Sequence, residues 1–248
     1  MTEQDGCWHH VSNFKLTETC DCSQMRKIFI TIAMLVQFVH AQNAAVSKED
    51  QYAKALELRV TKIITPLGIA QKRKQAKVHH TIMAQYQALN KIHTARDQKI
   101  KELKLLHSTA PNDLKTLVAE VETNAAKEIK GIHLDFLHDL GRHLTDTQLD
   151  AVKDGMTYNV ANITYKGYQE MLPSLNDSQK TKIWNWLVEA REIAMDAETS
   201  EKKHWWFGKY KGRINNYLSA EGFDMKKESE AWQKRIRSAS QTNPAKKS

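Results

Sequence analysis

The sequence has few cysteines, and all of them lie near its start. Cys7, Cys20 and Cys22 fall within the first 24 residues, and no cysteine follows them. The pair Cys20 and Cys22 lacks both the two-residue spacing and the further ligands of a structural zinc site. No disulfide can therefore staple the rest of the chain, which has to be held together by a hydrophobic core.

Proline and glycine are also scarce, with four and nine copies in 248 residues. Both residues interrupt helices, and the chain has few of the β-branched runs that favour strands. We therefore predict an all-α fold, with a single helical domain over residues 42–237. A domain of about 200 residues is long enough to bury a sizeable core.

The chain has no apolar run of the about 20 residues that a membrane-spanning helix needs. Its apolar stretch Ile28–Val39 follows the basic start Met25–Lys27 and ends in Val39–Ala41, with small residues where a signal peptidase requires them. This pattern is typical of a secretory signal peptide over residues 25–41. We expect a mature protein that begins at Gln42, is periplasmic or secreted, and has no transmembrane segment after cleavage.

The two ends of the chain are expected to lie outside the fold. Residues 1–24 form a charged segment ahead of the basic start, which is unusual for a secretory signal and is explained by an upstream start codon chosen in error. Residues 238–248 are polar and basic, and we predict a disordered tail there.

The mature chain is basic. Removing the three basic and four acidic residues of the first 41 leaves 34 basic against 25 acidic residues, a net charge of +9. An exported protein meets little nucleic acid, so we expect no nucleic-acid partner. Anionic polysaccharide, lipopolysaccharide phosphate and membrane surface are the acidic partners that remain.

Two long helical periodicities follow one another in the middle of the chain. Apolar residues recur at whole helical turns over residues 69–106 and again over 114–140. The segment between them, 108–113, contains serine, proline and asparagine and is expected to turn. We predict an antiparallel helical hairpin over residues 69–142.

Shorter helices are expected on both sides of the hairpin. Residues 49–64 read as an amphipathic helix that ends at Thr65–Gly68, where proline and glycine stop it. Residues 145–237 form an aromatic-rich part that holds every tryptophan of the mature chain.

Three histidines, His133, His138 and His143, suggest a metal site at first. Their spacing of five residues places successive rings about 140° apart around a helix, so they do not converge on one ion. A solvated helix face explains them better. His79, one turn before Met83, offers too few ligands, and we predict neither a metal nor a cofactor.

Two pentapeptides echo each other, LTDTQ at residues 144–148 and LNDSQ at 175–179. In each, a capping residue precedes glutamine by three positions, which is the pattern of a capping box at a helix start. The pentapeptides also resemble the LTxxQ motif of the periplasmic chaperones Spy and CpxP. That resemblance implies a chaperone or an envelope-stress function.

An acidic face is expected on the helix over residues 177–199. Glu189, Glu192 and Asp196 fall within about 60° of one another at 100° per residue. Such carboxylates can serve acid–base chemistry or bind a cation, and they can also form a solvated acidic face.

The densest aromatic segment is residues 204–218, HWWFGKYKGRINNYL. If it is helical, Trp206, Tyr210, Arg213 and Tyr217 lie within about 60° and form what we call the aromatic stripe. Aromatic rings stack on the apolar faces of sugars, and a guanidinium pairs bidentately with a carboxylate, so the stripe suits an acidic sugar.

The alternative for the stripe is packing. Its rings would wedge the helix against the acidic one, with Arg213 or Lys209 paired to Glu192 or Asp196. Two glycines on the same helix, four residues apart, would let another helix or a ligand approach its backbone.

The segment from Glu189–Arg191 through residues 204–218 to Gly222–Asp224 resembles the domain of unknown function 3826 family. The resemblance covers nearly all of the mature chain. Members of that family are exported bacterial proteins, often encoded among genes for the breakdown of plant polysaccharides, pectins especially. The resemblance implies a helical fold and a carbohydrate context, but no established reaction and no catalytic residues.

These observations favour a noncatalytic protein that binds acidic, pectin-like polysaccharide or oligosaccharide. The predicted ligand-binding residues are those of the aromatic stripe and two neighbours, namely Trp206, Lys209, Tyr210, Arg213, Asn216 and Tyr217.

One alternative is a lyase or hydrolase that acts on the same substrates. Its candidate base is His204 or Tyr210, and its acid partner is Glu192 or Asp196. Arg213 or Lys209 would neutralise the substrate carboxylate. The other alternative is a Spy-like chaperone. The sequence predicts no oligomeric state.

Overall fold

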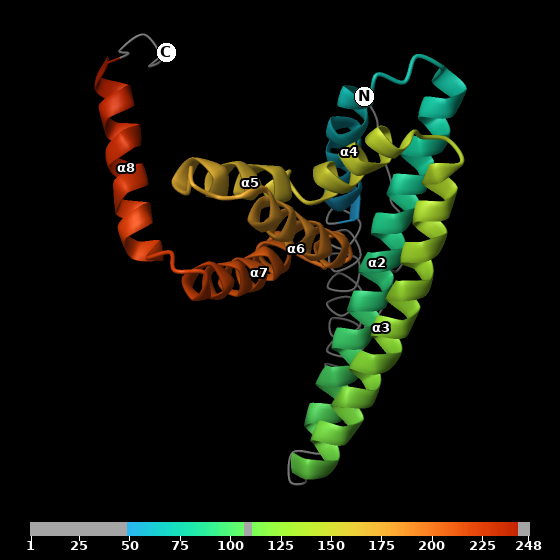
Figure 1. Ribbon diagram of the computed structural model, residues 1–248. Coiled ribbons are helices and arrows are strands. Elements are labelled where there is room, and N and C mark those ends of the chain that lie inside the picture. The colour runs from blue at the N-terminus through green and yellow to red at the C-terminus, as the bar shows by residue number, and fades with distance from the viewer. Residues whose placement is uncertain (1–48, 107–110, 243–248) are drawn as a thin grey trace, which may run out of the picture. The chain divides into compact units, whose positions relative to one another are not determined.

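A computed structural model describes residues 49–106 and 111–242 (Figure 1). The predicted signal peptide, residues 1–24, the first half of the predicted turn and residues 243–248 lie outside the described residues. The chain divides after Ala53 into two compact units, and of the first only residues 49–53 are described. Every interaction reported below lies within the second unit, which begins at Lys54.

All regular structure in the described residues is helical, which confirms the predicted all-α fold. Residues 49–64 are helical, and a 3-10 turn, η1 (Thr65–Leu67), follows them. Gly68 ends this turn with φ 62°, a left-handed conformation that glycine adopts without strain. No helix in residues 49–106 and 111–242 is long and apolar enough to cross a bilayer.

The predicted hairpin consists of α2 (Lys72–Leu106) and α3 (Pro111–Gly141), which pack side by side in Figure 1. Both helices bury one apolar face at spacings of three and four residues, as the periodicity predicts. The two helices of the hairpin make most of their contacts with each other.

Five shorter helices follow. They are listed here in chain order: α4 (Asp146–Met156), α5 (Val160–Met171), α6 (Asp177–Met195), α7 (Ser200–Ala220) and α8 (Met225–Thr242). Helix α6 contacts α4, α5 and α7, so it is the central element of this part. Helix α8 ends at Thr242, inside the segment predicted as a tail.

Two of these helices begin with the capping boxes that the sequence predicts. The Thr145 hydroxyl accepts a hydrogen bond from the Gln148 amide, and the Gln148 side chain accepts one from the Thr145 amide. Asn176 and Gln179 repeat the arrangement at the start of α6. Each box satisfies amides that a helix start would otherwise leave without partners.

The buried apolar side chains form two clusters. The first combines residues 56–86 with the end of α3 and with α4, and the second joins α5, α6 and α7. Met195, the last residue of α6, lies fully buried in the first cluster, whereas Leu187 and Ala190 of the same helix belong to the second. The end of α6 is thereby fixed against the hairpin, which places the turn between α6 and α7 beside α2 and α3.

Candidate functional site

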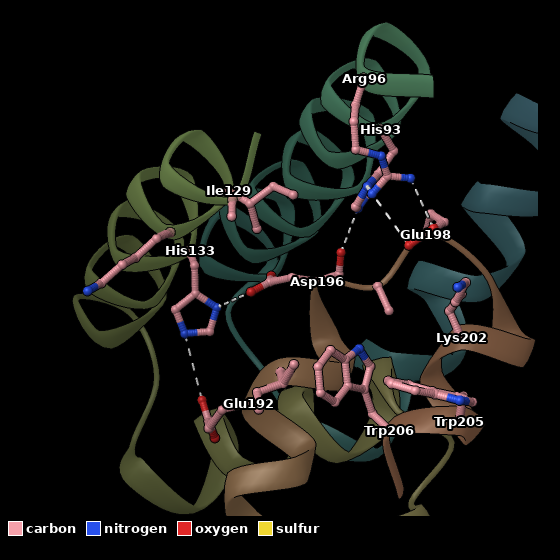
Figure 2. A pocket seen from close by; sticks show the side chains of 14 residues that line it. His93, Arg96, Ile129, His133, Glu192, Asp196, Glu198, Lys202, Trp205 and Trp206 are labelled. Carbon is pink, nitrogen blue, oxygen red and sulfur yellow. Dashed lines mark hydrogen bonds and ion pairs between the residues drawn. The ribbon is translucent and has the colours of Figure 1, made fainter. Parts of the chain in front are cut away.

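A pocket of about 580 Å³ lies where the turn between α6 and α7 meets the hairpin. Its walls come from α2, α3, the end of α6 and the start of α7, as Figure 2 shows. We call it the tryptophan pocket, after two neighbouring rings at one side. The lining residues used below are His93, Lys130, His133, Glu192, Asp196, Glu198, Lys202, Trp205 and Trp206.

His133 is the central titratable group of this pocket. Its Nδ1 lies 2.8 Å from Oδ2 of Asp196, and its Nε2 lies 3.8 Å from Oε2 of Glu192. The Nδ1 contact is an ion pair that lies off the line of a hydrogen bond. Asp196 raises the pKa of His133 above its ordinary value although burial opposes the charged form.

Glu192 connects His133 to a second group of charges. Both of its oxygens lie 3.0 Å from Nζ of Lys153 on α4. The neighbouring Arg191 is buried and donates to Asp154 at 2.8 Å and to Asp150 at 2.6 Å. Two consecutive residues of α6 are therefore tied to α4, which fixes the position of the Glu192 carboxylate.

His93 supports the opposite wall. Its Nε2 donates to the Asp196 carbonyl at 2.7 Å, and its Nδ1 accepts from Arg96 at 3.0 Å. Because a carbonyl only accepts and a guanidinium only donates, this pattern assigns the neutral Nε2–H tautomer. Arg96 also pairs with Glu198 at 3.1 Å. Burial raises the pKa of Glu198, but hydrogen bonds from its own backbone and from Arg96 outweigh burial and hold it below the usual range.

Trp205 and Trp206 form the aromatic side of the pocket. Their rings meet edge to face, with centroids 4.9 Å apart. Trp205 remains 55% exposed, although large apolar side chains are usually covered. Lys209 lies 5.1 Å from the Trp206 ring and 5.8 Å from the Trp205 ring, and Lys202 lies 5.9 Å from the Trp205 ring.

The charges of the pocket are divided between its interior and its rim. Glu192, Asp196 and Glu198 each contact a cation or a histidine. The exposed lysines Lys130, Lys202 and Lys209 form no ion pair with any carboxylate of the described residues. Two of these lysines, Lys202 and Lys209, lie within 6 Å of a tryptophan ring of the pocket.

The aromatic stripe is divided by the structure. Trp206 lines the pocket, but Tyr210 is buried, and burial raises its pKa to about 12, with Glu189 contributing. Arg213 pairs with Glu189 at 3.3 Å, and Tyr217 meets the Trp186 ring edge to face. Most of the stripe thus packs α7 against α6, as in the packing alternative. The partner of Arg213 differs from the prediction, because it is Glu189 and not Glu192 or Asp196.

The other predicted residues of α7 do not line the tryptophan pocket. Asn216 and Lys209 are exposed. No atom from outside their own helix lies within 4 Å of the place that a Cβ of Gly208 or Gly212 would occupy, so no second helix of the described residues approaches there. His204 lies outside the tryptophan pocket and stacks on Tyr158, with ring centroids 5.8 Å apart.

The acidic candidates Glu192 and Asp196 are brought together at His133, whereas Glu189 faces Tyr210 and Arg213. The expected solvated histidine face holds for His138, whose side chain is 75% exposed, but not for His133. Within the part of the chain that the structure describes, no three His, Cys, Asp or Glu side chains are placed to hold a metal ion.

Sequence reasoning missed the role of His133. It weighed this histidine as a metal ligand with His138 and His143, and it preferred a solvated helix face. The usable signal was its position four residues after Ile129, at the edge of the apolar stripe of α3, because a polar residue there borders a buried surface. His93 and Lys130 carried no comparable signal.

A second cavity of about 630 Å³ lies between α5, α7 and α8. Tyr168 and Trp232 are among its lining residues, and the Tyr168 hydroxyl donates to Asn215 at 2.7 Å. Arg235 joins α8 to the end of α5 by donating to the carbonyls of Glu170 and Met171. This cavity contains no acid–base pair comparable with His133 and Asp196.

Comparison with known proteins gives one family. The family model described as protein of unknown function (DUF3826) matches residues 53–238. The matched segment contains the hairpin, both apolar clusters and the whole tryptophan pocket. No curated protein matches the chain.

Proposed function

We propose, for a chain that belongs to the DUF3826 family, that the tryptophan pocket binds an acidic saccharide such as a pectin-like polyuronate. The observation that carries this proposal is the combination of an exposed tryptophan with unpaired lysines at the rim of a pocket whose carboxylates are all paired. The proposal includes export to the periplasm or the medium, where such polymers are met.

Trp205 and Trp206 provide the surface for the sugar ring. An indole offers a flat apolar face to the C–H groups of a pyranose and buries large area at little cost in side-chain entropy. Trp205 is the better anchor because more than half of it is accessible without any rearrangement.

The rim lysines provide the preference for acidic sugars. Lys130, Lys202 and Lys209 are exposed, and the carboxylates nearby already have partners. A ligand carboxylate can therefore pair with these lysines, and a neutral sugar gains nothing from their charge. Lysines on flexible stems also tolerate several positions of the carboxylate along a polymer.

The proposed binding site is displaced from the aromatic stripe toward the start of α7. It keeps Trp206 and Lys209 from the predicted set and adds Trp205, Lys130 and Lys202. Tyr210 is excluded as a contact because it is buried between α6 and α7. Both LTxxQ-like pentapeptides act as helix caps, which accounts for them without a client-binding role.

Binding to polygalacturonate and to a neutral glucan, measured by calorimetry, tests the proposal. We expect binding to the acidic polymer alone, with an affinity about tenfold weaker in Trp205→Ala, or a loss of about 1.4 kcal/mol. Lys202→Ala is expected to weaken binding at low salt and to matter less as ionic strength screens the charge.

Matched controls come from the same protein. Trp232→Ala removes a tryptophan of the second cavity, and Lys166→Ala removes an exposed lysine of α5; neither residue lines the tryptophan pocket. Equal affinity for both polymers, or unchanged binding in folded Trp205→Ala, would refute the proposed site.

A further inference from the structure

A saccharide-binding pocket has no need of a histidine held between two carboxylates. We propose that His133 transfers a proton in the tryptophan pocket, so that the protein is a lyase that cleaves uronate-containing glycans by β-elimination. This inference rests on the proposed function, because it takes the same ligand in the same pocket.

His133 acts as the base once it has lost one proton. Its Nδ1 lies 2.8 Å from the Asp196 carboxylate, so the neutral imidazole keeps its proton on that nitrogen and has a lone pair on Nε2. The Nε2 edge faces the pocket beside Glu192, at 3.8 Å, with Trp206 also in the wall (Figure 2). Asp196 acts through His133 and is a positioning residue.

The charges around His133 suit reversible protonation. From α6 it is faced by Asp196 and Glu192, and from α4 by Lys153, which opposes the two carboxylates. The paired carboxylate of Asp196 raises the pKa of His133 above its ordinary value, although burial opposes this. A base whose pKa lies nearer the working pH transfers protons more efficiently in both directions.

The elimination is balanced by groups of the chain and substrate alone. Neutral His133 takes the proton from C5 of the uronate through Nε2, and the C5–H electron pair forms the C4=C5 double bond. The bond between C4 and the glycosidic oxygen breaks, and the oxygen receives the proton from the imidazolium. One product carries a 4,5-unsaturated uronate, the other a new reducing end, and no water or oxidant is consumed.

The rim lysines have a role in this step. A proton beside an ionised carboxylate is weakly acidic, and positive charge on that carboxylate stabilises the carbanion character that develops at C5. Lys130 and Lys202 line the same pocket as His133 and have no carboxylate partner in the described residues.

Elimination is favoured over hydrolysis by the state of the pocket carboxylates. A glycosidase needs one carboxylic acid kept protonated by an apolar setting and a second that stays ionised. Here Glu192 contacts Lys153, Asp196 contacts His133 and Glu198 contacts Arg96, so each carboxylate has a cationic partner or a histidine.

The test incubates the protein with polygalacturonate and with alginate and follows the ultraviolet absorbance of the unsaturated product, with new reducing ends counted in parallel. We expect one unsaturated end for each new reducing end. His133→Ala and His133→Gln are expected to lower the rate at least about 100-fold while binding by calorimetry stays within about threefold.

Two further variants separate catalysis from structure. Asp196→Asn is expected to lower kcat and to move the acidic limb of the pH–rate profile to lower pH, which a purely structural residue would not do. His138→Ala, an exposed residue of the same helix, is expected to change neither rate nor binding.

Each outcome decides the question. Binding without any new ends overturns the lyase and leaves the binding function intact, whereas the absence of binding overturns both. Saturated products indicate hydrolysis and overturn the elimination. Full turnover in folded His133→Gln overturns the assignment to His133.

Discussion

The His133 Nδ1 on α3 lies 2.8 Å from the side-chain carboxylate of Asp196, the C-cap residue of α6. A carboxylate at a helix C-terminus faces the negative end of the helix dipole, and the paired imidazole offsets that repulsion. The contact also joins the hairpin to the central helix of the other half of the fold.

The titration of His133 tests this pair. In the wild type we expect a pKa above 6.5, and in Asp196→Asn a value below the wild-type value, because burial then acts with less opposition. Histidine resonances followed by NMR across pH 5 to about 9 measure both. Unchanged chemical shifts of the buried apolar side chains would show that the variant keeps the fold.

The same pair makes stability depend on pH. The folded-state pKa of His133 is raised, so its stabilising contribution is complete below the unfolded pKa near 6.5 and is lost as pH rises through the folded pKa. Asp196→Asn should remove this part of the pH dependence. Identical His133 titrations in the two proteins would show that the pair does not form in solution.

Arg191 is expected to be a strong determinant of stability. It is 3% exposed and pairs with Asp150 and Asp154, so Arg191→Met leaves the Asp154 carboxylate half-buried without its cation. Removing one partner of a buried pair costs about 3–5 kcal/mol in the free energy of unfolding, to be measured by urea denaturation.

Arg213→Met is the matched control for Arg191. Arg213 pairs with Glu189, but both side chains are about half exposed, at 54% and 52%. An exposed ion pair contributes about 1 kcal/mol or less, although lost packing on Trp186 adds to this cost. Equal losses in the two variants would contradict the expected dependence on burial.

Because Lys203 is buried, we expect the free energy of unfolding to rise at alkaline pH. It is 3% exposed, its Nζ donates to the carbonyls of Ala194 and Met195, and burial lowers its pKa from 10.5 to about 8. Above pH 8 the folded protein releases this proton while the unfolded chain keeps it. Stability from this group therefore increases, on the order of 2 kcal/mol between pH 8 and about 9.5.

Comparing wild type with Lys203→Met isolates this effect, because the variant cannot titrate there. The pH range should stop near 9.5, since the raised pKa values of Tyr168, Tyr210 and Tyr217 reduce stability once the unfolded tyrosines ionise. The two proteins should differ in the slope of unfolding free energy against pH. Parallel slopes would mean that Lys203 is not desolvated.

The hairpin and the two capping boxes could be predicted from the sequence because their signals are local. Apolar residues at whole turns define the faces of α2 and α3, and Thr145 with Gln148 satisfies amides within one turn. The same local reasoning grouped Glu192 with Asp196 on α6.

The site could be predicted only in part. Helical spacing places Trp206, Tyr210, Arg213 and Tyr217 together, but it cannot tell which side of α7 meets another helix. Packing of α6 against that side buries Tyr210 and pairs Arg213 with Glu189. Trp205, which precedes Trp206 and is not part of the stripe, stays exposed and lines the pocket.

The sequence by itself determined the helical class, the hairpin, the helix starts and the membership of the family, because each depends on neighbours along the chain. The meeting of His133 with Asp196 was decided by tertiary structure alone. Those residues are 63 positions apart in the chain. They meet because Met195 is buried in the first apolar cluster, which places the end of α6 beside α3. Helical periodicity shows which face of a helix is apolar, but it does not show which other helix that face packs against.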